Sequence, residues 1–191
     1  MTNSLNPPAP HAETSAGRAI FWGALISGVL DISGACIQSW FIRGVTPDVV
    51  LKGVASAVLG APAMKGGWLI AALGLAMHFT VATTATVVFY ALSRRFAFLT
   101  KRAVLSGLAF GAVVFCTMNF VTLPGLGIFR HFTYGTPFQY APPMGWIQFW
   151  IHLGCVGLPI ALCVRRFCPV VASAEISMTT TFRAMKPAKA R

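Results

Sequence analysis

Residues 68–92, WLIAALGLAMHFTVATTATVVFYAL, form a run of 25 residues that contains no Asp, Glu, Lys or Arg. About 20 apolar residues in a helix are enough to cross the hydrocarbon core of a bilayer, which is about 30 Å thick. Lipid offers the backbone no hydrogen-bonding partners, so a spanning segment of this kind must satisfy its own as a helix. The alternating pattern of a membrane β-strand is absent from it. This stretch therefore predicts a transmembrane helix.

Three further apolar segments of similar length lie at residues 19–42, 103–123 and 145–164. Hydrophobic residues make up 56% of the chain and charged residues only 10%. A soluble domain carries about a quarter charged residues, so this chain has too few to cover a surface that faces water. We predict an all-α polytopic membrane protein, a four-transmembrane-helix bundle embedded in lipid.

The basic residues predict the orientation of the bundle. One set flanks the predicted helices on a single side: Arg18, Arg94, Arg95, Lys101, Arg102, Arg165 and Arg166. The positive-inside rule places that side in the cytoplasm, with both chain ends inside. The first loop opposes this weakly with Arg43, Lys52 and Lys65. The net charge of +11 is spread over loops and tails, which fits anionic lipid and argues against nucleic acid as a partner.

The segments outside the predicted helices divide the chain. Residues 1–17 predict a disordered cytoplasmic tail without the pattern of a signal peptide, residues 18–166 the transmembrane domain, and residues 167–191 a basic cytoplasmic tail. In the first outer loop, Thr46, Pro47 and Asp48 predict a helix start with a capping hydroxyl, and the following apolar run to Leu59 predicts a short interfacial helix. The second outer loop, residues 124–143, is rich in aromatic residues and predicts an interfacial belt.

Each predicted helix carries one conspicuous polar residue: Asp31, His78, Asn119 and His152, in chain order. Counted from the cytoplasmic end of each helix, Asp31, His78 and His152 lie about a dozen residues in. At 1.5 Å per residue they share one layer near the midplane to within roughly 5 Å. Asn119 lies about one turn closer to the outside. We expect the four side chains to face the interior of the bundle as an intramembrane polar cluster.

Small and polar residues recur at helical spacing beside the four cluster residues, which favours an inward orientation of each stripe. The polar and thiol members of these stripes are Ser27, Gln38, Cys116, Gln148 and Cys155. Helix three adds Gly107 and Gly111, a pair that permits close approach of two helices. The five cysteines show no CxxC spacing and predict neither a disulfide framework nor a zinc site.

Energetics predict a specific contact within the cluster. An ionised Asp at the bilayer centre costs at least ~2.5–3.5 kcal/mol. A carboxylate beside an imidazole offsets this cost by sharing a proton. We therefore expect Asp31 to contact His78 or His152.

Three interpretations of the cluster remain open at the level of sequence. It can be a structural clamp in a non-catalytic binding or assembly protein, with helix register as its role. It can be the proton relay of a small transporter or proton-linked channel. Asp31, His78 and His152 can also hold a divalent metal, or the two histidines a haem, in a redox subunit. No catalytic residue is predicted, since hydrolase and nucleotide motifs are absent. Partners other than lipid are expected to be a second copy or other membrane subunits.

Several stretches resemble a set of uncharacterised four-helix inner-membrane proteins of bacteria. They are ASAVLG at 55–60, GGW at 66–68, GLAMHF at 74–79, and His152 followed by VGLPIAL at 156–162. The resemblance covers most of residues 19–166. It implies a four-helix membrane fold and an inner-membrane location, and it carries no activity and no catalytic residues.

Overall fold

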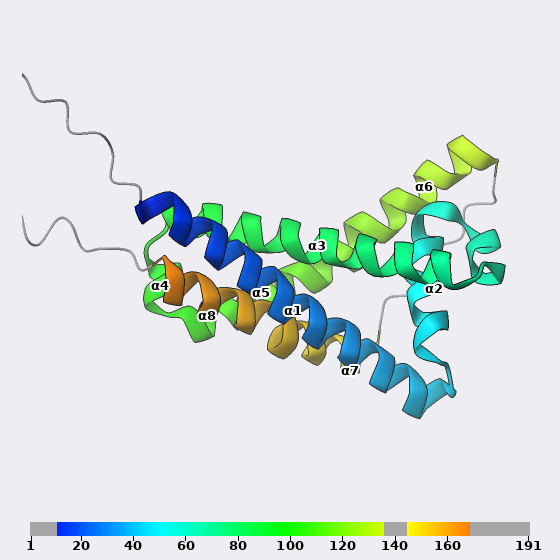
Figure 1. The fold of residues 1–191 in the computed structure, drawn as a ribbon, viewed down its shortest axis with the longest axis horizontal. Helices are drawn as coiled ribbons and strands as arrows, with labels where there is room; N and C mark the ends of the chain where they lie inside the picture. The colour runs from blue at the N-terminus through cyan, green and yellow to red at the C-terminus, as the bar shows by residue number, and fades with distance from the viewer. Residues whose placement is uncertain (1–10, 136–144, 169–191) are drawn as a thin grey trace, which may run out of the picture.

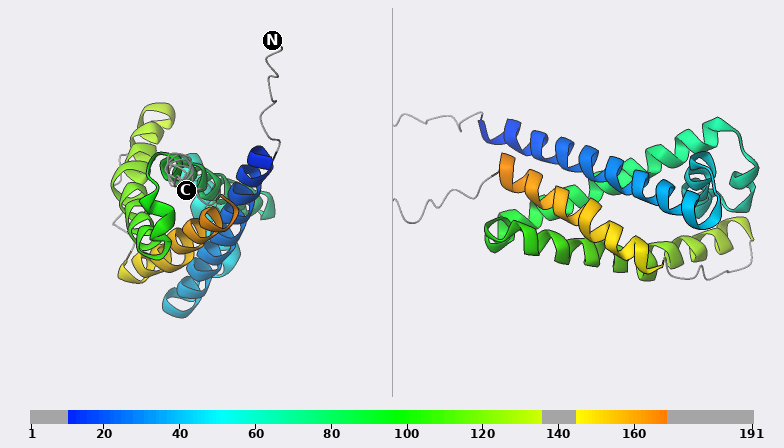
Figure 2. Two further views of the ribbon diagram at one scale, coloured as in Figure 1. Left: turned by 90° about the vertical axis from the view of Figure 1, so that its left-hand side faces the viewer. Right: turned by 90° about the horizontal axis from the view of Figure 1, so that it is seen from below.

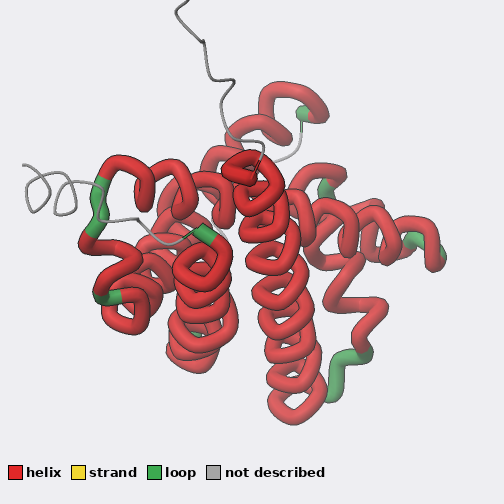
Figure 3. Tube along the Cα trace, turned by 60° about the vertical axis from the view of Figure 1, so that its left-hand side comes forward, coloured by secondary structure: helices red, strands yellow, loops and turns green. Residues whose placement is uncertain are grey.

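The computed structural model describes residues 11–135 and 145–168, and the side chains of the first range from residue 15 onward. Within these ranges every regular element is a helix (Figures 1 and 3). The elements are α1 (His11–Arg43), α2 (Pro47–Leu59), η1 (Ala61–Lys65), α3 (Trp68–Arg95), α4 (Phe98–Lys101), α5 (Ala103–Thr117), η2 (Met118–Thr122), α6 (Leu123–Tyr134), α7 (Trp146–Ile151), η3 (His152–Gly157) and α8 (Leu158–Phe167).

Four continuous helices in this set are long and apolar enough to cross a membrane. They cover Ser15–Arg43, Trp68–Arg95, Ala103–Tyr134 and Trp146–Phe167. The prediction of an all-α bundle with four spanning helices is confirmed, and the chain is a multi-pass membrane protein. The first described turn of α1 and the last turn of α8 lie at the same end of the bundle, beside α4 (Figure 1). We call this the α4 end, and the opposite end, crossed by α2, the α2 end.

Two predicted boundaries are wrong. Helix α1 begins at His11 rather than at about residue 19, so residues 11–17 belong to a helix and not to an unstructured tail. No proline follows Pro10 in this part of the chain, and nothing there stops the helix from extending. The predictions for residues 1–10 and for the tail beyond residue 168 lie outside the described residues.

The third span also runs farther than predicted. Residues 123–134 form helix α6 rather than part of a loop, which places Phe129, Phe132 and Tyr134 on a helix. The helix ends at Gly135, whose φ of 62° is the left-handed conformation that favours glycine. The remaining aromatic residues of the predicted loop, Phe138 and Tyr140, lie outside the described residues.

The two prolines within the spanning helices each follow a π-helical segment. η2 directly precedes α6, which has Pro124 in its first turn, and η3 directly precedes α8, which has Pro159 in its first turn. A proline ring conflicts with the carbonyl four residues before it in an α-helix, and the wider π turn accommodates the ring. For this reason the prolines do not end the helices, and spans three and four remain continuous.

The four spans pack most closely at the α4 end. The buried core there includes Ala19, Phe89, Ala103, Ile160 and Val164. Helix α5 meets η3 and α8 backbone to backbone, since a Cβ on Gly157 would overlap the carbonyl of Gly107 and lie 2.7 Å from the Cα of Gly111. The glycine pair that the sequence predicts as a close-approach motif therefore has its partner on the fourth span.

Toward the α2 end the spans diverge, and α2 crosses the space between them (Figures 1 and 2). Helix α2 packs against α3, where a Cβ on Gly74 would overlap the Leu51 carbonyl. On its other side, Nη1 of Arg130 on α6 donates a hydrogen bond to the Ser56 carbonyl at 2.7 Å. Helix α2 is thus held between two spans at its end of the bundle.

The predicted start of α2 is confirmed, but its predicted capping bond is wrong. Thr46 makes no side-chain cap to the backbone. Its hydroxyl donates instead to the Asp48 carboxylate, which also pairs with Lys52 at 2.9 Å. The Thr46 hydroxyl and then the Lys52 ammonium hold the pKa of Asp48 below its ordinary value. In a cap the hydroxyl oxygen accepts from a backbone N–H, whereas here the hydroxyl donates its proton to a charged acceptor, a stronger bond than one between neutral groups.

Candidate functional site

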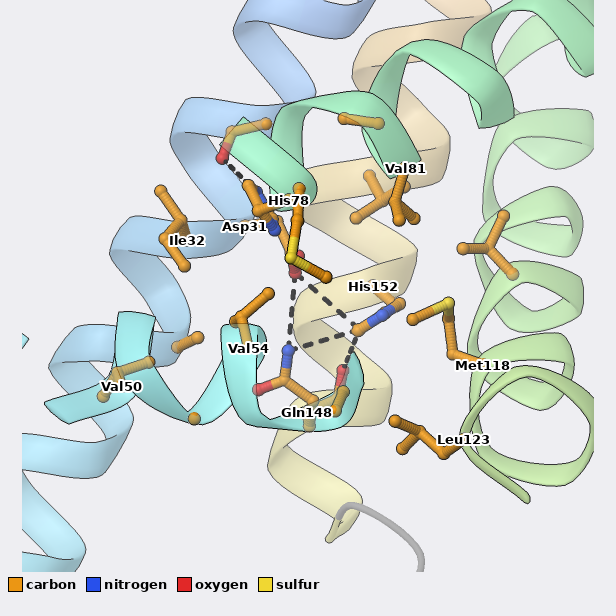
Figure 4. Close-up of a pocket in the computed structure, with 18 of the residues that line it drawn as sticks. Asp31, Ile32, Val50, Val54, His78, Val81, Met118, Leu123, Gln148 and His152 are labelled. Atoms are coloured by element: carbon orange, nitrogen blue, oxygen red, sulfur yellow. Dashed lines mark hydrogen bonds and ion pairs between the residues drawn. The ribbon is translucent and has the colours of Figure 1, made fainter. Parts of the chain in front are cut away.

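A cavity of about 700 Å³ lies between the spans on the side of α2. It is lined by all four spans and by α2, and its walls are mainly apolar (Figure 4). Along α1 the lining runs from Arg43 to Ser27, a distance of about 24 Å at the helical rise of 1.5 Å per residue. The cavity therefore reaches from one end of the bundle to its middle.

Three polar side chains from two spans meet in the cavity wall. Nε2 of Gln148 donates to Oδ1 of Asp31 at 3.4 Å, and Nδ1 of His152 lies 3.7 Å from the same oxygen. The side chain of Asp31 is 13% exposed and that of His152 is 6% exposed. The contact expected between Asp31 and a histidine is thus made with His152. We call Asp31, Gln148 and His152 the polar triad.

His152 is also bonded to its own helix. Its Nδ1 lies 2.9 Å from the carbonyl of Gln148, one turn earlier. A carbonyl oxygen only accepts, so Nδ1 carries the proton in this shorter bond, and Nε2 of Gln148, 3.4 Å from Nδ1, donates to Asp31 rather than to the ring. In a neutral imidazole Nε2 of His152 is then an acceptor. The ring also lies edge-on to Phe115 of α5, with centroids 5.5 Å apart. These contacts hold the imidazole at one place beside Asp31.

His78 lines the same cavity but does not join the triad. Its Nε2 lies 2.9 Å from the carbonyl of Gly28 on α1, three residues before Asp31. By the same argument Nε2 donates, and Nδ1 is left as an acceptor in the neutral ring. Asp31, His78 and His152 therefore line one cavity, in which only two of the three side chains touch (Figure 4). Their common depth in the membrane stays a prediction.

The other predicted residues divide between the cavity and its surroundings. Ser27 and Gln38 line the cavity, and Oε1 of Gln38 is buried without a hydrogen-bond partner in the part of the chain that the structure describes. Asn119 is buried but outside the lining, and its amide donates to the Phe115 carbonyl at 2.8 Å. Cys155 is half-buried and also outside the lining.

The inward placement of Cys116 is wrong, because its side chain is exposed. The buried stripe of the third span advances in steps of four residues through Gly107, Gly111 and Asn119, with Phe115 half-buried between them. Cys116 falls one residue beyond this stripe and lies on the outer face of the helix.

The arrangement does not assemble the metal site that the sequence left open. Within the described ranges, no three His, Cys, Asp or Glu side chains converge on a point where a metal ion could bind. His78 uses Nε2, the usual nitrogen for axial haem ligation, on the Gly28 carbonyl. Asp31, His78 and His152 thus fit neither a three-ligand metal site nor a bis-histidine haem site, and we derive no chemistry through either group.

Sequence reasoning missed the wall that α2 contributes. Val50, Gly53, Val54 and Ala57 of α2 line the cavity. The recurrence of these residues at spacings of three and four was visible as one helical face. The sequence does not predict that this face covers a cavity, because that depends on the packing of α2 against α3.

Comparison with known proteins adds no assignment to this geometry. No family model matches the chain, and neither a curated protein nor a solved structure matches it.

Proposed function

We propose that this chain is a non-catalytic membrane protein that binds a small amphipathic molecule in the cavity between its four spans. The observation that carries the proposal is the combination of a mainly apolar cavity of about 700 Å³ with a few convergent polar groups. Binding sites for small molecules have volumes of roughly 300–1,000 Å³ and the same division between apolar walls and a few polar contacts.

The free-energy cost of burying the polar triad in the membrane supports a role for it beyond helix packing. A purely structural clamp would use all its polar atoms within the protein, since unpaired polar groups in lipid are expensive. Here Oδ2 of Asp31 forms no hydrogen bond with any described residue, and Oε1 of Gln38 is buried and unpaired. Both residues line the cavity. A bound molecule would supply the missing partners.

A cavity-filling substitution tests the proposal. Gly53 lines the cavity, and a Cβ added there meets no atom within 4 Å. We expect Gly53→Trp to fill the cavity without displacing the backbone and to abolish saturable binding of the neutral naphthalene dye prodan to the protein in nanodiscs. The measurement is the dye's emission shift above that of empty nanodiscs.

The matched control is Gly125→Trp. Gly125 is exposed on α6, also has open space at its Cβ, and does not line the cavity. We expect this variant to bind prodan as the unmodified protein does. Equal binding by all three proteins, or none by the unmodified protein, would rule out the cavity as a binding site.

We propose a location in the bacterial inner membrane, and the distribution of basic residues supports an orientation with both chain ends in the cytoplasm. Among the described residues, the α4 end carries Arg18, Arg94, Arg95, Lys101, Arg102, Arg165 and Arg166, whereas the α2 end carries Arg43, Lys52, Lys65 and Arg130. The positive-inside rule then favours a cytoplasmic α4 end. The bilayer is the proposed surrounding partner, because large apolar side chains such as Phe41, Phe132 and Trp146 are exposed on the outside of the bundle.

A second candidate is a proton-linked transporter, favoured by the pairing of Asp31 with His152 across two spans. If this pair relays protons, Asp31→Asn is expected to reduce proton flux into liposomes at least about tenfold, as removal of an essential relay group does. Flux is measured with an internal pH-sensitive dye. A variant that folds and conducts as the unmodified protein does would exclude the relay and leave the binding function as the one candidate.

A further inference from the structure

Four polar atoms of the cavity that lack a partner within the described part of the chain are hydrogen-bond acceptors. Among the described residues, no partner is found for Oδ2 of Asp31, for the free ring nitrogens of His78 and His152, or for Oε1 of Gln38. In their neutral forms the two rings present Nδ1 of His78 and Nε2 of His152 as lone pairs. A molecule that satisfies these atoms must be a donor of hydrogen bonds.

The charged side chains of the cavity lie at different depths, the acid deep and the base at the α2 end. Asp31 is the one acid in the lining that the described residues provide, and it lies at mid-depth on α1. Arg43 is the one lysine or arginine in the lining; it is exposed at the α2 end, where it donates to the Ser39 hydroxyl at 2.8 Å. The twelve residues between Asp31 and Arg43 separate them by about 18 Å along the helix. The deep part of the cavity is therefore acidic, and no lysine or arginine of residues 15–135 or 145–168 lines it.

Apolar groups surround this acidic part. Ile32 of α1, Val54 of α2, Val81 of α3 and Met118 of η2 line the cavity around the triad (Figure 4). An apolar body would contact these side chains, while its charged group would need a counter-charge, because an unpaired ion in a medium of low dielectric constant is strongly disfavoured. Asp31 supplies that counter-charge.

We infer that the molecule bound in this cavity is an amphipathic amine, a protonated primary or secondary ammonium group on an apolar body, and this inference rests on the binding function proposed above. The ammonium group donates to Oδ2 of Asp31 and to one of the neighbouring acceptors on His78, His152 or Gln38. An alcohol has a single donor and no charge. A quaternary ammonium has the charge but no N–H, and a carboxylate would be repelled by Asp31.

A matched series of probes tests the inference by displacement of prodan from the full chain in nanodiscs. The probes are naphthylmethylammonium, its trimethylammonium analogue, naphthylmethanol and naphthoate. We expect naphthylmethylammonium to bind at least about tenfold more tightly than each of the other three, a difference of ~1.4 kcal/mol. Equal or tighter binding of the alcohol, the quaternary analogue or the carboxylate would overturn the assignment of ligand class.

Two variants locate the effect. Asp31→Asn keeps the shape and one acceptor oxygen of the side chain but removes its charge. We expect it to lose about tenfold in affinity for naphthylmethylammonium and less than about twofold for naphthylmethanol. Asp48→Asn, which removes an exposed acid outside the cavity, should change neither. A loss of ammonium binding in Asp48→Asn as large as in Asp31→Asn would overturn the role of Asp31.

The outcomes separate this inference from the proposed function. If prodan binds saturably and Gly53→Trp removes that binding, but the ammonium has no advantage, the ligand class is wrong and the binding function stands. If prodan does not bind, the binding function itself fails. The series measured on the unmodified protein decides the ligand class alone, so poor folding of Asp31→Asn leaves the test intact.

Discussion

Gly157→Val is expected to destabilise the bundle by about 3 kcal/mol or more, at the upper end of the range for overpacked cores. A Cβ at this position would overlap the Gly107 carbonyl and lie 2.5 Å from the backbone nitrogen of Gly111. These are backbone atoms of α5, so no side-chain rotation can relieve the overlap. The two helices would have to separate along their closest contact. The free energy of unfolding, measured by titration with SDS in mixed micelles, checks this.

Gly154→Val is the matched control, because Gly154 lies in the same π-helical segment and has no atom within 4 Å of an added Cβ. The change in intrinsic helix propensity is the same in both variants and cancels in the comparison. Equal destabilisation by the two substitutions would contradict the close approach of α5 and η3. Separation of α5 from η3 in Gly157→Val would also disturb the polar triad, since Gly111 packs against the carbonyl of His152.

Phe89→Ala should destabilise the bundle by ~2 kcal/mol. Phe89 is fully buried and lies edge-on to Phe110, with ring centroids 5.0 Å apart. Lipid is as apolar as the interior, so the transfer of the ring from lipid contributes little. The lost packing remains: a void of roughly 100 Å³ at about 24 cal/mol per Å³ gives this estimate. The same SDS titration measures it.

Phe41→Ala provides the comparison, because Phe41 is 82% exposed and its loss leaves no internal void. We expect a change below about 0.5 kcal/mol, as for substitutions away from packed sites. Addition of benzene should partly restore Phe89→Ala, since the ring removed is of the same size and apolar voids stay dry and take up small aromatic molecules, but it should not restore Gly157→Val. A Phe89 variant as stable as the Phe41 variant would show that this core is loosely packed.

The number and approximate position of the spans were predictable because lipid imposes a simple rule on composition and length. The run at 68–92 corresponds to α3, which ends three residues later, at Arg95. The errors at residues 11–17 and 123–134 have one cause. The predicted ends were set where the hydropathy of the sequence falls. A helix instead continues until its terminal backbone N–H and C=O groups find other hydrogen-bond partners. Gly135 provides such an end, and Pro124 does not.

The candidate site also has features that the sequence predicts and features that it does not. Counting residues placed Asp31 and His152 at one depth, because the helical rise is constant. The bond from His78 to the Gly28 carbonyl was not predictable, since it depends on the rotation of α3 against α1. Cys116 was misplaced by a single residue for the same reason.

The amino-acid sequence by itself determined that this chain has four membrane-spanning helices and that each carries at least one polar residue that is costly to place in lipid. Hydropathy and helical rise are properties of single segments, and they do not depend on contacts with other helices. Only the tertiary structure decided that α2 closes a cavity, that Gln148 joins Asp31 to His152, and which polar atoms remain unpaired. Those outcomes depend on the rotation and close approach of helices far apart in the chain, which no single segment encodes.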